Sequence, residues 1–206
     1  WYLFSYDQEF TRDALVSVAR FCESQEYHGI ATWLYDLAYA QIGDNDSVAI
    51  ELAQQYKKNG NYTKAEFTLR KAITDGASVE LYTALCQTFV EQDKLLDAIN
   101  MLNNITDPEI KQQLDEMRPA APVSSHVSGQ YNQIITVEFT APDGTLYVAI
   151  DGEYPSTETD HYTSPITLAE GENNVYSISV ADNGLVSQLS VYGYTIGGII
   201  RPVTFA

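Results

Sequence analysis

The chain has 206 residues, 45% of them apolar, and a formal net charge of −17. This length is enough for two domains with sizeable cores, and the apolar content is typical of folded chains and not of disordered ones. The bases are too few to neutralise phosphates, with 10 in residues 1–118 and one in residues 119–206, which excludes nucleic acid and anionic lipid as favoured partners.

A pattern of paired helices recurs in the first half of the chain at an interval of 33 or 34 residues. In each copy, apolar or small residues step by three or four, which is the helical period, and a short polar break separates two such runs. The three copies carry them at Leu15, Val18, Ala19, Cys22, His28, Ala31, Tyr35 and Ala38; at Ala49, Leu52, Ala53, Tyr56, Tyr62, Ala65, Leu69 and Ala72; and at Tyr82, Leu85, Cys86, Phe89, Leu95, Ala98, Leu102 and Ile105. The sequence therefore predicts about three helical hairpins.

Alanines 31, 65 and 98 occupy the same place in each copy, where two helices are expected to cross closely and a larger side chain would overpack. On these positions residues 12–118 resemble the tetratricopeptide repeat family. The outer copies depart from its pattern, because Glu26 and Asp93 replace the turn glycine. The resemblance implies an α–α superhelix whose concave side binds peptide segments.

The segment DPEIKQQLDEM is predicted to be a terminal helix, with Asp107 as its N-cap and Pro108 at its first position. We expect it to cover the open end of the array. Pro119 and Pro122 then mark a linker. These signals predict a helical domain at 1–118 and a second domain at 119–206.

Beyond the linker the apolar period changes from 3.6 to 2, which indicates strands. Alternation is clear at 135–139, 146–150, 176–180 and 189–191, and Asp-Gly, Asn-Gly or lone Gly turns separate the runs. Short strands at this spacing predict an antiparallel β-sandwich. The tail GGIIRPVTFA is predicted to add an edge strand.

Several segments of this second domain carry a further resemblance. SGQY, GTLYVAIDGEYPS, YTSPITLAEGENNVYSISVADNGLVS and YGYTI are similar to the fibronectin-III-like domain at the C-terminus of chitobiases and β-hexosaminidases, over residues 122–196. The resemblance implies an accessory domain with Ig/Fn3-like topology, and no catalytic carboxylates.

The inner helices of the array are predicted to form a partner-binding groove. Its candidate residues lie on successive turns of one concave track: Arg20, Ile50, Gln54, Lys57, Gln87 and Val90. The track is comparatively basic for an acidic molecule, and the amides at 54 and 87 repeat one structural position, where they can bond the backbone of an extended segment. The set of basic residues that grips chaperone C-termini is missing.

No catalytic constellation is present. His28, His126 and His161 stand in no nucleophile or metalloprotease pattern, and two lone cysteines, Cys22 and Cys86, make neither a zinc finger nor a disulfide scaffold. We expect both thiols to be free.

Two loop features of the second domain leave binding alternatives open. The acids Asp151, Glu153, Glu158 and Asp160 crowd one loop without EF-hand spacing, and Tyr131, Tyr154 and Tyr162 offer a surface for sugar stacking. A calcium site and a sugar site are therefore alternatives, but the expected function requires no cofactor, metal or catalysis.

These observations predict a non-catalytic adaptor that binds a protein or peptide segment in the helical groove. The alternative, from another class, is a module of the β-domain that binds carbohydrate or cell-wall polysaccharide, with the repeats as spacer. By the habit of the second family, we expect a bacterial, extracellular or surface location, with membrane attachment only through a segment upstream of Trp1.

Overall fold

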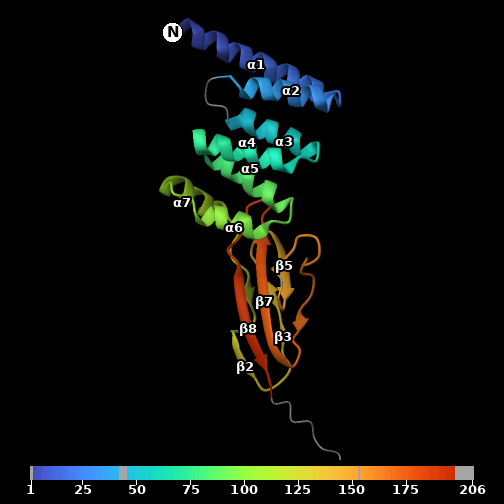
Figure 1. The fold of residues 1–206 in the computed structure, drawn as a ribbon. Helices are drawn as coiled ribbons and strands as arrows, with labels where there is room; N and C mark the ends of the chain where they lie inside the picture. The colour runs from blue at the N-terminus through green and yellow to red at the C-terminus, as the bar shows by residue number, and fades with distance from the viewer. Residues whose placement is uncertain (1, 42–45, 153, 198–206) are drawn as a thin grey trace, which may run out of the picture. The chain divides into compact units, whose positions relative to one another are not determined.

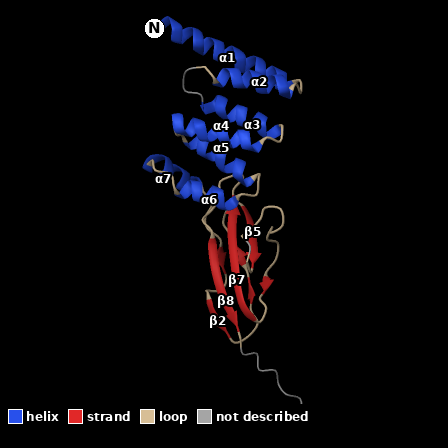
Figure 2. Cartoon of the chain, in the orientation of Figure 1, coloured by secondary structure: helices blue, strands red, loops and turns tan. Residues whose placement is uncertain are grey.

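A computed structural model of the chain describes residues 2–41, 46–152 and 154–197, and the side chains among these from residue 10 onward. It is a mixed α plus β structure, with seven helices in the described N-terminal part and sheets in the C-terminal part (Figures 1 and 2). The chain divides into two compact units. We call residues 1–92 with 107–113 the helical unit, and residues 93–106 with 114–206 the strand unit.

The helical elements follow one another as the apolar period predicts. Their bounds are α1 Tyr2–Ser24, α2 His28–Tyr39, α3 Asp46–Lys58, α4 Tyr62–Asp75, α5 Val79–Val90, α6 Leu95–Asn103 and α7 Pro108–Met117. Side-chain caps begin several of them: Asn61 accepts from the Lys64 N–H, Ser78 from the Leu81 N–H, and Asp107 from the first turn of α7. The predicted N-cap at Asp107 is thus confirmed.

Within the helical unit, each helix packs against the next. Contacts join α1 to α2, α2 to α3, α3 to α4 and α4 to α5, and α3 also meets α5. Ala31 and Ala65, the predicted crossing positions in this unit, have no exposed surface, and neither does the equivalent Ala98. The expectation that a larger side chain would overpack there agrees with this complete burial.

The turn between paired helices has a left-handed residue in all three copies. Glu26, Gly60 and Asp93 have φ angles of 62°, 72° and 59°, at the interval that the sequence predicted. The Tyr27 and Asn61 N–H groups then donate to the carbonyls of Cys22 and Tyr56, so the two turns close the same way. Glutamate thus occupies a conformation that favours glycine.

Glu26→Gly is therefore expected to stabilise the helical unit by about 1 kcal/mol, because it removes the cost of a left-handed non-glycine residue. The measurement is urea unfolding followed by tryptophan fluorescence, since both tryptophans belong to the helical unit. Gly60→Ala is the matched control: a Cβ there would meet nothing within 4 Å, so the variant should lose a similar amount through backbone strain alone. A loss of stability in Glu26→Gly would contradict this account of the turn.

The strand unit holds three small sheets. The first pairs β1 Val123–Ser124 with β4 Phe139–Thr140, and the third pairs β3 Thr136–Val137 with β6 Ile166–Thr167. The second has the order β2-β8-β7-β5, from β2 Gly129–Tyr131, β8 Ser190–Ile196, β7 Gly171–Val180 and β5 Thr145–Ile150. The predicted strands at 146–150 and 176–180 are confirmed within β5 and β7.

Two sequence expectations about the strands need correction. The sheets are not wholly antiparallel, because β2 pairs with β8 in parallel register, which is possible since the two segments lie some sixty residues apart in the chain. The alternating run 135–139 is not one strand either. It breaks at Glu138, so β3 and β4 pair with different partners. The predicted edge strand in the tail lies outside the described residues, apart from Gly197.

One apolar core joins the three sheets. It contains residues from β3, β4, β5, β7 and β8 and from the loop segments beside them: Ile135, Val137, Phe139, Val148, Leu168, Val175, Tyr194 and Ile196. The alternation seen in the sequence predicted this core in the first strands, where Val137, Phe139 and Val148 belong to it. It was wrong for β8, where Val191 is 55% exposed and Tyr194 and Ile196 are the core residues.

The helix α6 belongs to the strand unit, although its sequence repeats the pattern of α2 and α4. Asp93 accepts hydrogen bonds from the Thr157 N–H at 2.6 Å and from its hydroxyl at 2.9 Å. Arg118 Nε donates to the Val186 carbonyl at 2.8 Å, and the amides of Asn103 and Gln188 bond each other. Residues on the N-terminal side of the predicted boundary after 118 are thus hydrogen-bonded to the segments between the strands. The domain boundary stays a prediction.

Two further findings concern the chain as a whole. Cys22 is half-buried and Cys86 is buried, and neither takes part in a disulfide, as the sequence predicted. Among the residues that the structure describes, none of the helices combines the length and the apolarity that a bilayer span requires.

Candidate partner-binding groove

The residues predicted to line the groove lie on the first helix of each successive pair in the helical unit. Those that are exposed are Arg20 on α1, Gln54 on α3 and Gln87 on α5, and those that are half-buried are Ile50, Lys57 and Val90. The contact between α3 and α5 brings the last two of these helices side by side. The two exposed amides stand 33 residues apart, at equivalent positions.

The cations of this track are paired with carboxylates from the neighbouring copy. Arg20 forms two hydrogen bonds to the Glu51 carboxylate, one of them from Nε at 3.1 Å. Lys57 Nζ lies 2.9 Å from Glu91 Oε1. The track therefore has no surplus of positive charge at these two places, and a peptide partner meets ion pairs instead of free bases.

Hydrogen bonding and then charge from Glu51 raise the pKa of the Arg20 guanidinium. A third ion pair, which the sequence reasoning also missed, joins Lys58 to Glu23. The hydrogen bond from Lys58 lowers the pKa of Glu23, against the opposing effect of burial. These pairs join each helical pair to the next across the surface of the track.

The sequence signal that could have revealed these ion pairs is the placement of opposite charges about one repeat interval apart. Oppositely charged residues stand 31, 34 and 35 positions apart in Arg20–Glu51, Lys57–Glu91 and Glu23–Lys58. In stacked hairpins, residues one interval apart come close together. Surface ion pairs of this kind contribute about 0–1 kcal/mol each, so they add little to the stability of the stack.

The amides of Gln54 and Gln87 differ from their charged neighbours. In the part of the chain that the structure describes, neither side chain makes a hydrogen bond to another residue, and both are exposed. Each amide can donate and accept at once, which matches the alternating groups of a peptide backbone. These two residues therefore carry most of the track's unused hydrogen-bonding capacity.

The three tyrosines proposed for sugar stacking lie in different environments: two pack against the core and one is exposed. Tyr131 and Tyr162 pack against the core, and their hydroxyls bond the Val127 carbonyl and the Phe139 N–H. Tyr154 is 53% exposed, and its ring lies 5.3 Å from the ring of Tyr176 on β7. The three predicted tyrosines do not act together, but Tyr154 and Tyr176 form an aromatic pair that the sequence reasoning missed.

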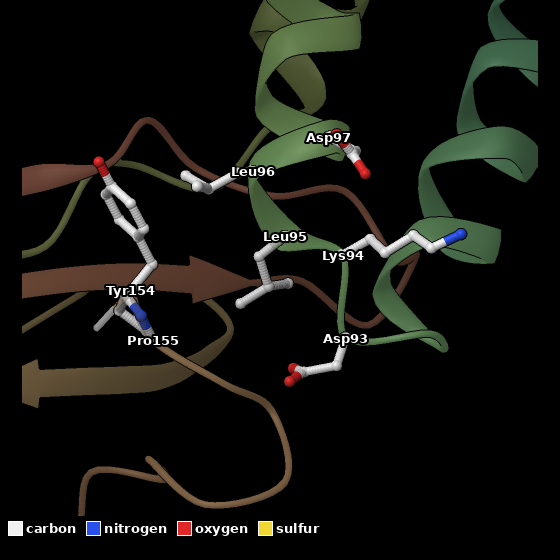
Figure 3. A pocket seen from close by; sticks show the side chains of 7 residues that line it. All are labelled: Asp93, Lys94, Leu95, Leu96, Asp97, Tyr154 and Pro155. Carbon is white, nitrogen blue, oxygen red and sulfur yellow. The ribbon is translucent and has the colours of Figure 1, made fainter. Parts of the chain in front are cut away.

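An open pocket of about 320 Å³ lies beside this pair in the strand unit. It is lined by Asp93, Lys94, Leu95, Leu96, Asp97, Tyr154 and Pro155 (Figure 3). In the close-up, Lys94 points away from Tyr154, and Asp93 is the group already bonded to Thr157. The lining therefore offers few polar groups that converge on a ligand, which small-molecule sites require.

Two carboxylates of the acidic loop already accept hydrogen bonds from backbone N–H groups, one on β7 and one in the loop itself. Asp151 accepts from the Asn174 N–H at 2.7 Å, and Asp160 accepts from the Ser156 N–H at 2.8 Å. Glu153 lies outside the described residues. Among the described residues, no three acids, histidines or cysteines gather closely enough to hold a metal ion.

Comparison with known proteins gives no match: no family model fits the chain, and neither the curated proteins nor the solved structures include a significant relative. The fold and the residues described above are accordingly the basis for any functional assignment.

Proposed function

We propose that this protein is a non-catalytic adaptor that binds an extended peptide segment along α1, α3 and α5. The proposal takes the helical unit to be a tetratricopeptide-type array, which is supported by the interval, the buried alanines and the left-handed turns. The observation that carries it is the pair of exposed amides, Gln54 and Gln87, at equivalent positions on adjoining helices.

The spacing of these amides suits a peptide backbone. Packed helices lie about 8–10 Å apart, and an extended chain advances about 3.3 Å per residue, so equivalent amides meet the peptide about every third residue. The buried side chains of α3 and α5 hold the helices at that spacing before the partner arrives, which lowers the cost of ordering on binding. Because the paired cations leave the unit acidic overall, the preferred segment is neutral or basic.

The strand unit is proposed to be the second docking surface or spacer, of the fibronectin-III-like kind resembling the chitobiase C-terminal domain. Its shared core across three sheets supports a sandwich architecture. On the same resemblance, we propose a bacterial cell-surface location for the protein. A second candidate function is sugar binding, which the exposed Tyr154 and its contact with Tyr176 favour.

The test uses a random peptide library displayed on phage and the immobilised full chain. Wild type is expected to enrich neutral or basic extended peptides, and Gln54→Ala with Gln87→Ala should weaken the selected peptides about tenfold or more, since amide contacts at a desolvated centre cost about 1–2 kcal/mol each. The matched control removes two exposed amides off the track, Gln25→Ala with Gln113→Ala, and should bind as wild type does.

Equal binding by the two double variants would show that the groove is not the site. Arg20 is left unchanged in the test because its loss would also leave Glu51 without its ion-pair partner. If instead insoluble chitin or cell-wall polysaccharide depletes the protein, and Tyr154→Ala abolishes the depletion, the sugar-binding candidate replaces the adaptor.

A further inference from the structure

Exposed apolar side chains are concentrated on one side of α1. We define the α1 stripe as Phe10, Ala14, Val18 and Phe21, which stand three or four positions apart and so share a helix face. Phe10 is 72% exposed, Val18 50% and Phe21 64%. An apolar stripe left in water along a helix marks an interaction surface.

The equivalent face is covered in the next two copies. Ala14, Val18 and Phe21 correspond, one interval further on, to residues of α3 and α5 that are at most 4% exposed: Val48, Leu52 and Gln55, and then Leu81, Leu85 and Thr88. These residues are buried in a unit where α3 packs on α2 and α5 on α4. The α1 stripe therefore occupies a helix-packing position, and within the described residues no helix covers it.

A helix face of a stacked array that meets water is ordinarily polar, because an apolar one would make the array insoluble. The α1 stripe departs from that rule with two phenylalanines and a valine. Burying such side chains stabilises by about 1.5–3 kcal/mol each. A helix with an apolar stripe of its own would bury them, as α2 and α4 do for the equivalent residues of α3 and α5.

The length of α1 indicates how long a helix must be to cover the whole α1 stripe. It has 23 residues, against 12 in α2, 13 in α3 and 12 in α5. The turn at 25–27 joins α2 to the C-terminal end of α1, so α2 can run back along only about half of it (Figure 1). A full-length partner for α1 is a helix of about 34 Å, longer than any other in the described chain.

The order of residues along α1 is symmetric on reversal. In the sequence, Leu3 and Tyr6 continue the spacing of the stripe, so its positions read 3, 6, 10, 14, 18 and 21. Reflected about residue 12, position 10 falls on 14, 6 on 18 and 3 on 21. A two-fold interface demands this property, because residue i of one copy must meet j of the other and j must meet i.

We propose that two copies of this chain pair through the α1 stripe, with the two α1 helices antiparallel and the two-fold axis beside residue 12. The pairing buries Phe10 and Ala14 of each copy near the centre and Val18 and Phe21 toward the ends. It is independent of the peptide groove, since it uses the outer face of α1. The dimer places two grooves on one assembly, which raises avidity for a repetitive or clustered partner.

Sedimentation equilibrium of the full 206-residue chain, from about 1 μM to about 100 μM, tests the pairing. Wild type should reach twice the mass of 22.9 kDa. Val18→Gln with Phe21→Gln should raise the dissociation constant by about 100-fold or more. Phe67→Gln is the matched control, because Phe67 is 69% exposed on α4, off the stripe, and this variant should dimerise as wild type does.

Cross-linking with a short bismaleimide tests the direction of the helices, in a Cys22→Ser background that removes the half-buried thiol of α1. In the antiparallel register, the two copies of residue 14 are offset by about 6 Å along the axis and those of residue 24 by about 36 Å. Ala14→Cys should therefore cross-link to itself, and Ser24→Cys should not.

Two results would overturn the proposal. One is a wild-type monomer at every concentration, and the other is a dimer that persists unweakened in the Val18→Gln, Phe21→Gln variant. Efficient cross-linking through Ser24→Cys would overturn the antiparallel arrangement in favour of a parallel one. Far-UV circular dichroism of each variant verifies that the helices remain folded.

Discussion

Gly144→Ala is expected to destabilise the strand unit by about 3 kcal/mol, the sum of left-handed strain of about 1–2 kcal/mol and overpacking of about 1–3 kcal/mol. Gly144 has a φ of 82° in the turn before β5, and an added Cβ would lie 2.5 Å from the Val180 carbonyl oxygen and 2.8 Å from Ser179 Oγ. Because the nearest atom is backbone of β7, the neighbour cannot turn aside as a flexible side chain would.

Hydrogen exchange of the full chain measures this effect. Protection of the β5 and β7 amides from exchange should fall. The helical unit, followed by tryptophan fluorescence, should still unfold at the same urea concentration as in wild type. Gly152→Ala is the control: its φ is 106° but a Cβ there meets nothing within 4 Å, so it isolates the strain from the clash. Equal losses of stability in Gly144→Ala and Gly152→Ala would show that the contact between the added Cβ and Val180 does not contribute to the destabilisation.

The helical part of the fold could be predicted because its signal is local and repeated. The buried alanines and the turn positions recur at a fixed interval, so three copies support one interpretation. The turn at Glu26 and Asp93 shows the strength of this signal: the backbone is left-handed there even without glycine. A single copy would have left those positions ambiguous.

The strands were harder to delimit, since alternation reports which residues face the core and not which strand pairs with which. Val137 and Phe139 face one core, as their alternation predicts, yet they belong to different sheets. The parallel pairing of β2 with β8 joins residues more than sixty positions apart. No local pattern encodes a partner at that distance.

For the candidate groove, the sequence reasoning treated two of the predicted positions as a basic surface, and the structure pairs both of them with carboxylates. Arg20 and Lys57 looked basic because their partners, Glu51 and Glu91, lie on other helices. Neutralisation of this kind depends on how the helices stack, which the interval implies but residue counting ignores. The amides Gln54 and Gln87 became the better candidates once the stacked structure showed which groups were already paired.

The fragment 119–206 is expected to be less stable than the fragment 93–206 by about 3–6 kcal/mol, because it loses two charge-assisted hydrogen bonds of about 1.5–3 kcal/mol each. One joins Asp93 to Thr157 and the other joins Arg118 to the Val186 carbonyl. A domain of this size has about 5–15 kcal/mol in all, so the shorter fragment should be marginal. Urea unfolding of both fragments, followed by circular dichroism, provides the measurement.

The lowered pKa of Asp93 indicates that its ionised carboxylate is the form that accepts these hydrogen bonds. Burial alone would raise its pKa, but hydrogen bonds from Ser156 and Thr157 outweigh it, so the pKa lies below its ordinary value. A lowered folded pKa contributes stability above the unfolded pKa that is lost as the pH falls through the folded value. The difference in the free energy of unfolding between fragments 93–206 and 119–206 should therefore become smaller in acid. Asp93→Asn in fragment 93–206 should remove that pH dependence. If 119–206 unfolds at the same urea concentration as 93–206, the boundary predicted after residue 118 is the physical one, and α6 only rests against the strands.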